Sequence, residues 1–331
     1  MHPAPPLGAL LRQYAAGCAV TCEPVDQGLL NRGYRLRTTR GRYFLKHHFD
    51  PETADPAAIV RQHRATRRLA DLGVPVAPPL PARDGRTVAV IGGHAYALHP
   101  WVDGRHRHGG QLTPGQCTRL GALLGAVHAG LERVMPPSPR QPAQAADPED
   151  TFALIADLLG RVRRHRPADS FDALARHRLL ERRELLERHA DRRPPAGGPV
   201  GWVHGDFHPF NLLYKGDAPA AIVDWDRLGV QPRAEEAVRA AAIFFVRPAG
   251  TLDLPKVRAY TRAYRRAAGA TASELAAAVH RVWWERLNDF WMLRWHYERG
   301  DTRADPQFPA ASALAVWWTR EYDTVCDAFV D

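Results

Sequence analysis

A short polar segment in the second half of the chain carries the side chains best suited to chemistry. It reads HGDFHPFN over residues 204–211, and it contains Asp206 and Asn211. Thirteen residues after Asn211, the apolar pair at 222–223 is followed by Asp224. Mg²⁺ prefers oxygen ligands of this kind and binds through one or two carboxylates together with substrate phosphates. An Asp, then an Asn, then an Asp that ends an apolar strand is an order typical of phosphoryl-transfer sites.

Two other interpretations of this segment remain open. Asp206 and Asn211 are also residue types that stabilise turns. His204, Asp206 and His208 stand at alternate positions and are possible zinc ligands, although no Cys or further His follows nearby in the sequence to complete a zinc site. His204 alone is better interpreted as a buried, hydrogen-bonded residue that organises the loop.

The segments HGDFHPFNLLY at 204–214 and IVDWD at 222–226 resemble the aminoglycoside phosphotransferase and choline kinase-like family. Members of this family share the protein-kinase fold and include small-molecule hydroxyl kinases such as type II homoserine kinase. The resemblance extends roughly over residues 20–300 and is sharp only at 200–226. It implies that Asp206 is the catalytic base and that Asn211 and Asp224 are the Mg²⁺ ligands. Asp226 is a weaker candidate for assisting a second metal.

The resemblance also assigns a role to Lys46, which lies on the second strand of a predicted hairpin. Kinases of this fold place there the lysine that contacts the α- and β-phosphates of the nucleotide. Lys46 is one of only three lysines among 45 basic residues, and a compact ammonium suits a phosphate clamp. The preceding turn, GLLNRG, stands where a phosphate-covering loop would be, and its glycines would let the backbone approach the triphosphate. Its candidate cofactor-binding residues are Gly28, Asn31 and Gly33.

Two further positions concern the nucleotide. The connector at about 99–104 is the predicted hinge, and the resemblance implies that its backbone binds adenine. Trp101 would flank the base, and Trp101 and Val102 are the candidate cofactor-binding residues there. The helix after the lysine strand normally supplies a Glu that pairs with the lysine, but this chain has Gln62 there. A glutamine can accept a hydrogen bond from the lysine without neutralising its charge, and Glu52 in the preceding loop is an alternative partner.

Residue patterns predict the elements that position these side chains. In the first hundred residues, alternation of apolar and polar residues predicts strands, and apolar spacing of three to four predicts one helix. The strands are expected at 34–38, 43–47, 87–91 and 94–98, and the helix at 57–72. Beyond residue 113 helical patterns dominate around a short island of strands. Helices are expected from 114 to 131, at 150–165, at 171–190 and from 234 onward, with the strand island at 200–226.

These elements indicate an α+β fold class with two lobes, as in protein kinases. A small β-rich lobe at 1–100 would bind the nucleotide, and a larger, mainly helical lobe at 105–331 would carry the catalytic and acceptor-binding residues.

One predicted helix near the C-terminus carries two stripes of interest. Four residues at helical spacing are interpreted as core: Trp284, Asn288, Trp291 and Trp295. A neighbouring stripe could bind a polar or cationic acceptor, or could equally be a solvated face, and it consists of Glu285, Asp289 and His296.

Composition narrows the classes of partner. The net charge is +9 over 331 residues, but its 45 basic residues are spread along the chain instead of clustering as a nucleic-acid footprint requires. The four scattered cysteines suggest reduced thiols in a cytoplasmic protein. No apolar run approaches the roughly 20 residues of a membrane span. We therefore expect neither a nucleic acid nor a membrane as partner, and the oligomeric state is not readable.

The favoured function is an ATP- and Mg²⁺-dependent kinase that phosphorylates a hydroxyl of a small molecule. An aminoglycoside, a homoserine- or choline-type amino alcohol, and a sugar are the candidate acceptors. A nucleotide-binding regulatory protein with little catalysis is the alternative from another class, and Gln62 is its motivation.

Overall fold

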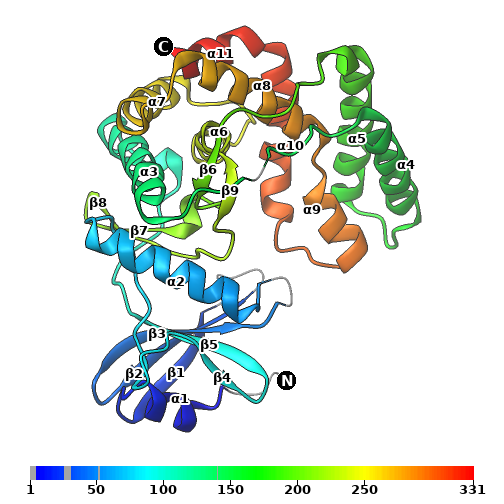
Figure 1. Cartoon of the computed structure of the whole chain (residues 1–331). Coiled ribbons are helices and arrows are strands. Elements are labelled where there is room, and N and C mark those ends of the chain that lie inside the picture. The colour runs from blue at the N-terminus through cyan, green and yellow to red at the C-terminus, as the bar shows by residue number, and fades with distance from the viewer. Residues whose placement is uncertain (1–4, 26–30, 51–52, 140) are drawn as a thin grey trace. The chain divides into compact units, whose positions relative to one another are not determined.

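The computed structural model describes residues 5–25, 31–50, 53–139 and 141–331 (Figure 1). The chain divides by its internal contacts into two compact units. The first unit contains Met1–Arg107, Ala126–Pro137 and His204–Gly229, and the second contains His108–Gly125, Ser138–Val203 and Val230–Asp331. The segment singled out at 204–226 therefore belongs to the same unit as Lys46.

A five-stranded antiparallel sheet forms the centre of the first unit. Its strand order is β1-β2-β3-β5-β4. Hairpin pairing sets the register, so that Lys46 lies opposite Gly33 on one side and Ala97 on the other. The predicted strands are confirmed within a few residues at each end. Their bounds are Ala19–Val25 for β1, Arg32–Thr38 for β2, Gly41–His48 for β3, Ala89–Ile91 for β4 and His94–Pro100 for β5.

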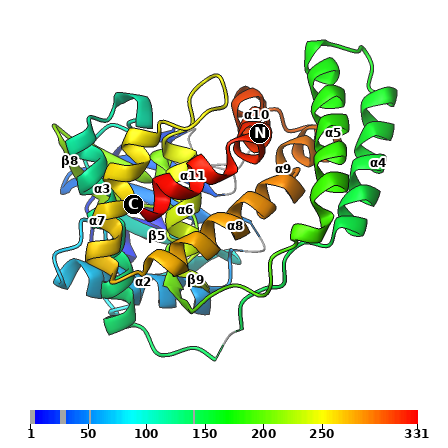
Figure 2. The ribbon, with the colours of Figure 1, turned by 90° about the horizontal axis from the view of Figure 1, so that it is seen from above.

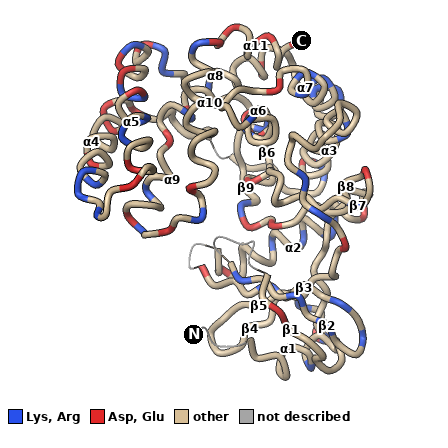
Figure 3. The backbone as a smooth tube through the Cα atoms, turned by 180° about the vertical axis from the view of Figure 1, so that it is seen from behind, with Lys and Arg blue, Asp and Glu red and all other residues tan. Residues whose placement is uncertain are grey.

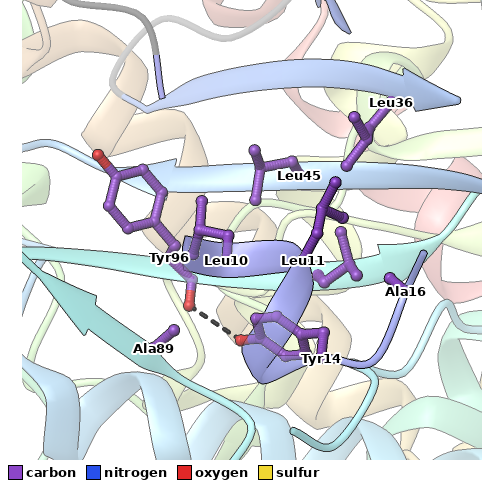
Figure 4. Packing of buried hydrophobic residues seen from close by; sticks show 9 residues of the cluster. Leu10, Leu11, Tyr14, Ala16, Leu36, Leu45, Ala89 and Tyr96 are labelled. Atoms are coloured by element: carbon purple, nitrogen blue, oxygen red, sulfur yellow. Dashed lines mark hydrogen bonds between the residues drawn. The ribbon is translucent and has the colours of Figure 1, made fainter. Parts of the chain in front are cut away.

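The short helix α1 (Leu7–Gln13), which the sequence analysis did not predict, covers part of this sheet. Leu10 and Leu11 of the helix pack with Leu36 and Leu45 in one buried cluster (Figure 4). Nearby, the Tyr14 hydroxyl donates to the carbonyls of Thr87 at 3.0 Å and Tyr96 at 3.3 Å. Burial of these apolar side chains fixes the back of the sheet that carries Lys46.

Helix α2 (Pro56–Asp71) confirms the helix expected at 57–72. Asp55 caps it by accepting from the amides of Ala57 and Ala58, and a proline follows in the first turn. Four residues at helical spacing along α2 are buried, and they are Ile59, Gln62, Thr66 and Leu69.

The strand island forms two separate two-stranded sheets. Strand β7 (Leu212–Lys215) pairs antiparallel with β8 (Ala218–Ile222), and β6 (Val200–Val203) pairs with β9 (Gly229–Pro232). The end of β8 is fixed within the first unit, because the Ile222 amide donates to the Pro75 carbonyl at 2.8 Å.

The second unit is mainly helical, and the predicted helices are confirmed. Helices α4 and α5 form an antiparallel pair whose charges alternate along the chain (Figures 2 and 3). Arg188 lies 3.9 Å from Glu184, so this surface is a solvated face of mixed charge. None of the described helices is both long and apolar enough to cross a membrane. The bounds are Pro114–Val134 for α3, which enters both units, Pro148–Arg164 for α4, Ser170–His189 for α5, Arg233–Phe244 for α6, Leu254–Ala268 for α7, Ala272–Asn288 for α8, Trp291–Arg294 for α9, Phe308–Arg320 for α10 and Tyr322–Val330 for α11.

The expectation of one continuous helix through residues 284–296 is wrong. Helix α8 ends at Asn288, and α9 begins at Trp291 before a π-helical turn at 295–299. The Asp289 carboxylate accepts the Trp291 amide at 3.0 Å, and this local bond competes with helical hydrogen bonding. Trp284 is buried as expected, whereas Trp291 and Trp295 are only partly buried.

Candidate active site

The loop between β6 and β7 is built around His204 and Gly205. His204 is fully buried; its Nε2–H donates to the Val223 carbonyl at 3.0 Å, and its Nδ1 accepts the Asp206 amide at 3.2 Å. Gly205 has a φ of +84°, and a Cβ there would lie 2.1 Å from the carbonyl oxygen of Arg227. Only glycine fits this turn. The loop-organising interpretation of His204 is confirmed, and both its ring nitrogens are engaged.

Asp206 follows this turn with its carboxylate near two basic side chains. Its Oδ2 lies 3.5 Å from Nε2 of His208 and 3.8 Å from Nε of Arg227. Burial opposes its ionisation, but His208, through a hydrogen bond and its charge, together with Arg227 holds the pKa of Asp206 below its usual value. Asp206 is therefore ionised at neutral pH and suited to accept a hydrogen bond from a hydroxyl group.

Asn211 ties this loop to the strand that leads to Asp224. The Asn211 Nδ2 donates to the Asp206 carbonyl at 2.8 Å, and its main-chain carbonyl accepts the Val223 amide at 2.9 Å. The side chain is buried, so its orientation is fixed by these bonds. Asn211 thus lies beside Val223, the residue that precedes Asp224, and its role as a metal ligand stays a prediction.

The zinc interpretation of His204, Asp206 and His208 finds no support. Within the described ranges, the one group of three such side chains in reach of a common ion is instead His165, Asp172 and His296, in the second unit.

Lys46 bridges the two carboxylates of the segment Asp224-Trp225-Asp226, called the DWD segment below. Its Nζ lies 2.7 Å from Oδ1 of Asp224 and 2.7 Å from Oδ1 of Asp226. The side chains of Lys46 and Asp226 are 12% and 11% exposed, whereas that of Asp224 is 44% exposed. Asp224 also has a φ of +59°, a left-handed conformation that Asp tolerates better than most residues. Asp226 is thus the buried anchor of the lysine, and Asp224 presents its carboxylate toward solvent.

The charges of this triad shift one another. Burial disfavours the charged form of Lys46, but the two carboxylates outweigh it and raise the lysine pKa. Burial likewise opposes ionisation of Asp224, and the adjacent ammonium holds the pKa of Asp224 well below its usual value. For Asp226, burial and the neighbouring Asp224 charge raise the pKa. The three groups therefore behave as one coupled charge cluster.

The structure gives Lys46 a partner different from the residue on the helix. Gln62 donates through Nε2 to the main-chain carbonyl of Asp226 at 3.0 Å, and the lysine pairs instead with the two carboxylates. Asp226 therefore supplies the negative charge that the helix lacks, and Gln62 holds the segment that carries it. Glu52, the alternative partner, lies outside the described residues.

The residues expected to lie around the nucleotide phosphates differ in the contacts that they make. Asn31 donates through Nδ2 to Asp226, and its Oδ1 accepts the Phe49 amide at 2.9 Å. Because Asp226 is bound to both Asn31 and Lys46, its contacts are those of an anchor, and its role as a metal ligand stays a prediction. Gly33 lies against Phe44, and a Cβ there would lie 2.6 Å from the ring, so a larger residue would displace that ring. Gly28 falls outside the described residues.

Strand β5 continues to Pro100 and so includes the first two residues of the connector at 99–104, whose role as a hinge stays a prediction. The Trp101 amide donates to the carbonyl of Arg42 at 3.2 Å, and its indole N–H donates to Asp103 at 3.1 Å. Trp101 and Val102 are partly buried. Contacts of these two residues with adenine stay a prediction.

The two acidic acceptor candidates lie in the second unit. Glu285 accepts two hydrogen bonds from Nε and Nη2 of Arg239, each at 2.9 Å to its nearer oxygen. Asp289 caps the start of α9 through Trp291 and remains exposed. Glu285 is thus already neutralised by an arginine, whereas burial raises the pKa of the Asp289 carboxyl although the residue as a whole is exposed.

Comparison with known proteins decides the family. The model of the phosphotransferase enzyme family matches residues 21–270. The chain belongs to this family. This phosphotransferase is 25% identical over 319 residues to a homoserine kinase of Acidiphilium cryptum, covering 89% of this chain and 94% of that protein.

Two solved structures show the same fold. A spectinomycin phosphotransferase in complex with ADP and spectinomycin matches 97% of both chains with a TM-score of 0.65 and 13% identity. A microcompartment-associated aminopropanol kinase matches 98% of this chain and 99% of its own with a TM-score of 0.62 and 16% identity. The predicted fold class and family are confirmed, and the protein is a small-molecule phosphotransferase with a hydroxyl acceptor.

Proposed function

We propose that this phosphotransferase transfers the γ-phosphoryl group of ATP to the hydroxyl of a small amino alcohol, with homoserine as the first candidate. Support comes from curated relatives named homoserine kinase, which match 80–89% of this chain at 24–29% identity. The aminopropanol kinase of the same fold acts on an acceptor of similar size, according to its name. Aminoglycosides and sugars are the competing acceptors that the test below must exclude. The free state of all four cysteines fits a cytoplasmic enzyme.

Asp206 is the proposed catalytic base. Its carboxylate is ionised and follows a turn that only glycine allows, so its position is set by the backbone. It would accept the hydrogen bond of the acceptor hydroxyl and orient that oxygen for attack. Because the loop is fixed by His204 and Asn211, much of the cost of ordering the base is met during folding.

Asn211 and Asp224 are the proposed ligands of Mg²⁺, and Lys46 is the proposed phosphate contact. Oxygen donors of these two types fit a magnesium ion, and the 44% exposure of the Asp224 side chain leaves its carboxylate accessible. When bound, Mg²⁺ neutralises charge on the phosphates of ATP. Lys46 carries a firmly protonated ammonium, which suits binding of phosphate oxygens.

A single observation carries the proposal. Lys46 from the sheet reaches both carboxylates of the DWD segment at 2.7 Å, while that segment is hydrogen-bonded at Val223 to both His204 and Asn211 of the Asp206 loop. The base, the metal ligands and the phosphate contact are thus joined in one hydrogen-bonded unit. Turn-forming residues alone would not require a buried lysine between them.

The test is phosphate transfer from ATP to a panel of homoserine, 3-aminopropan-1-ol, spectinomycin and a hexose. We expect the amino alcohols to be turned over at the highest kcat/KM. Asp206→Asn should lower kcat by about 10²- to 10⁴-fold with the melting temperature unchanged. Asp217→Asn is the matched control, because that carboxylate is 82% exposed in the same unit. Retention of wild-type kcat by Asp206→Asn would remove Asp206 as the base, and exclusive turnover of spectinomycin or hexose would remove the amino alcohol.

A further inference from the structure

Two histidines and an aspartate in the second unit are grouped closely enough to bind one metal ion. His165 follows the last turn of α4, Asp172 lies in the first turn of α5, and His296 lies in the π-helical turn at 295–299. Each side chain offers one ligand atom, and these atoms lie within 4.8 Å of one another. Figures 1 and 2 show α9, which leads into the π-helical turn, beside α5. None of the three residues has a part in the proposed phosphate transfer.

The His296 ring is held in the way that a metal-bound histidine is held. An ionised carboxylate only accepts hydrogen bonds, so Nδ1–H donates to Oδ2 of Asp305 at 2.8 Å and the lone pair is on Nε2. Phe171 stacks on the ring with centroids 4.3 Å apart, and the His296 side chain is only 8% exposed. A carboxylate on one ring nitrogen fixes the tautomer and makes the other nitrogen more basic toward a metal. Asp305 thus supports His296 as a ligand.

Asp172 is held by groups that can stay bound to it when it also binds a metal. The Tyr297 hydroxyl donates to its Oδ1 at 2.7 Å, and the Asp169 amide donates to its Oδ2 at 2.9 Å. His165 Nδ1–H donates to Oδ2 at 3.0 Å, and this is the bond that coordination of both side chains would replace. Asp172 is 5% exposed, whereas the His165 side chain is 36% exposed. An ion therefore has access to the group past His165.

The charges of this group favour a divalent cation. Asp172 and Asp305 bring two carboxylates to two histidines, and a histidine that binds a metal is neutral. Neither carboxylate forms an ion pair with a lysine or arginine in the part of the chain that the structure describes. Among those same residues, nothing donates a hydrogen bond to the buried Oδ1 atom of Asp305. Buried carboxylates without a matching charge are costly, and one divalent ion would neutralise both.

We propose that His165, Asp172 and His296 bind a zinc ion that ties the α4–α5 pair to the π-helical turn. Two imidazoles and one carboxylate are a donor set that zinc takes, with a water in the fourth tetrahedral position. Mg²⁺ prefers oxygen ligands, so a site with two ring nitrogens does not suit it. The ion would stabilise the second unit and has no step in phosphate transfer. The inference therefore goes beyond the proposed function and holds whichever acceptor the enzyme uses.

Zinc analysis of the purified chain and calorimetric titration of the metal-free chain test this site. Both use excess Mg²⁺, which occupies sites made of oxygen ligands alone. We expect one zinc per chain and a melting temperature about 4 °C higher at about 100 times the dissociation constant. His296→Gln and Asp172→Asn should each weaken zinc binding at least about 100-fold and remove most of that rise, and Asp305→Asn should weaken binding about 10- to 100-fold.

His177→Gln is the matched control, because that histidine is also on α5 and its side chain is 67% exposed. It should bind zinc as the wild type does. If His296→Gln or Asp172→Asn does not fold, His165→Gln provides the same comparison at a partly exposed side chain. Substitution by Co²⁺ excludes the cysteines, since a site of nitrogen and oxygen ligands gives no thiolate charge-transfer band.

The alternative is a purely hydrogen-bonded network of the same side chains. In that case His296→Gln would lower the melting temperature by the same amount with and without zinc, and zinc would not stabilise the wild-type chain. That result would overturn the site. Zinc binding that persists unchanged in both His296→Gln and Asp172→Asn, or a thiolate band with Co²⁺, would overturn it as well.

Discussion

Replacing Gln62 by Glu distinguishes two accounts of how Lys46 is held. If the helix residue paired with the lysine, as it does in related kinases, a carboxylate at this position would strengthen the pair. In this structure Gln62 is 6% exposed and donates to the Asp226 carbonyl at 3.0 Å, so a carboxylate would remove the donor and add charge beside Asp226. We therefore expect Gln62→Glu to weaken the enzyme.

The magnitude follows from the lost bond. An unsatisfied buried carbonyl costs about 1–3 kcal/mol, and the second carboxylate adds repulsion of the same sign. A loss of that size corresponds to a fall of about 1.5–4 °C in the melting temperature, because the unfolding entropy of a chain of 331 residues is about 0.7 kcal/mol/K. Displacement of Asp226 also removes one of the two carboxylates on Lys46, for which we expect a 5- to 50-fold higher KM for ATP.

The assay is thermal unfolding together with the dependence of phosphate transfer on ATP concentration. Gln62→Leu removes the donor without adding charge and should give a smaller effect on both measurements. Val60→Glu adds the same charge on the same helix at a side chain that is 46% exposed, and its melting temperature should change by less than about 1 °C. An unchanged melting temperature with an equal or lower KM for ATP in Gln62→Glu would refute the assignment of Asp226 as the lysine partner.

Two further predictions concern the first unit. Gly205→Ala should lower kcat at least 100-fold, because its Cβ would meet the Arg227 carbonyl oxygen at 2.1 Å. Gly216→Ala, with φ +58° and open space around it, should keep kcat, and equal losses in the two variants would contradict a steric cause. Acid should destabilise the fold through His48 and His63, which are 2% and 5% exposed and whose pKa values burial lowers to about 2 and about 3. In the unfolded chain each histidine can take up a proton once the pH is below its usual pKa of 6.5. The free energy of unfolding therefore decreases as the pH decreases, by about 2 kcal/mol per histidine between pH 7.5 and pH 5. Urea denaturation at pH 7.5 and pH 5 measures this, and a pH-independent free energy of unfolding would contradict it.

The parts of the site that are local in sequence could be predicted. Asp206, Asn211 and Asp224 lie within one segment of alternating strands and turns, and hydrogen bonds join Asn211 to Asp206 and to Val223, while the roles of the three side chains stay predictions. The strand pattern around Lys46 is also local, and the structure pairs that strand as expected.

Other features depend on contacts between distant residues. Gln62 and Asp226 are separated by 164 positions, and nothing in either neighbourhood indicates that they meet. The break after α8 was missed because tryptophan spacing favours a helix, whereas the outcome turns on one Asp289 side chain that bonds to the Trp291 amide.

The hydrogen bond from Gln62 to the Asp226 carbonyl is consistent with the net charge of the cluster around Lys46. Two carboxylates surround one ammonium, which leaves the cluster with one net negative charge beside the exposed Asp224 oxygen. A Glu at position 62 would bring a third carboxylate next to the main chain of Asp226, and desolvation would then favour protonating one of the carboxylates. A neutral donor on the helix therefore goes with a charged anchor on the DWD segment. The negative charge that a helix glutamate would supply thus comes from Asp226 instead. The missing glutamate is therefore not a sign of a lost activity.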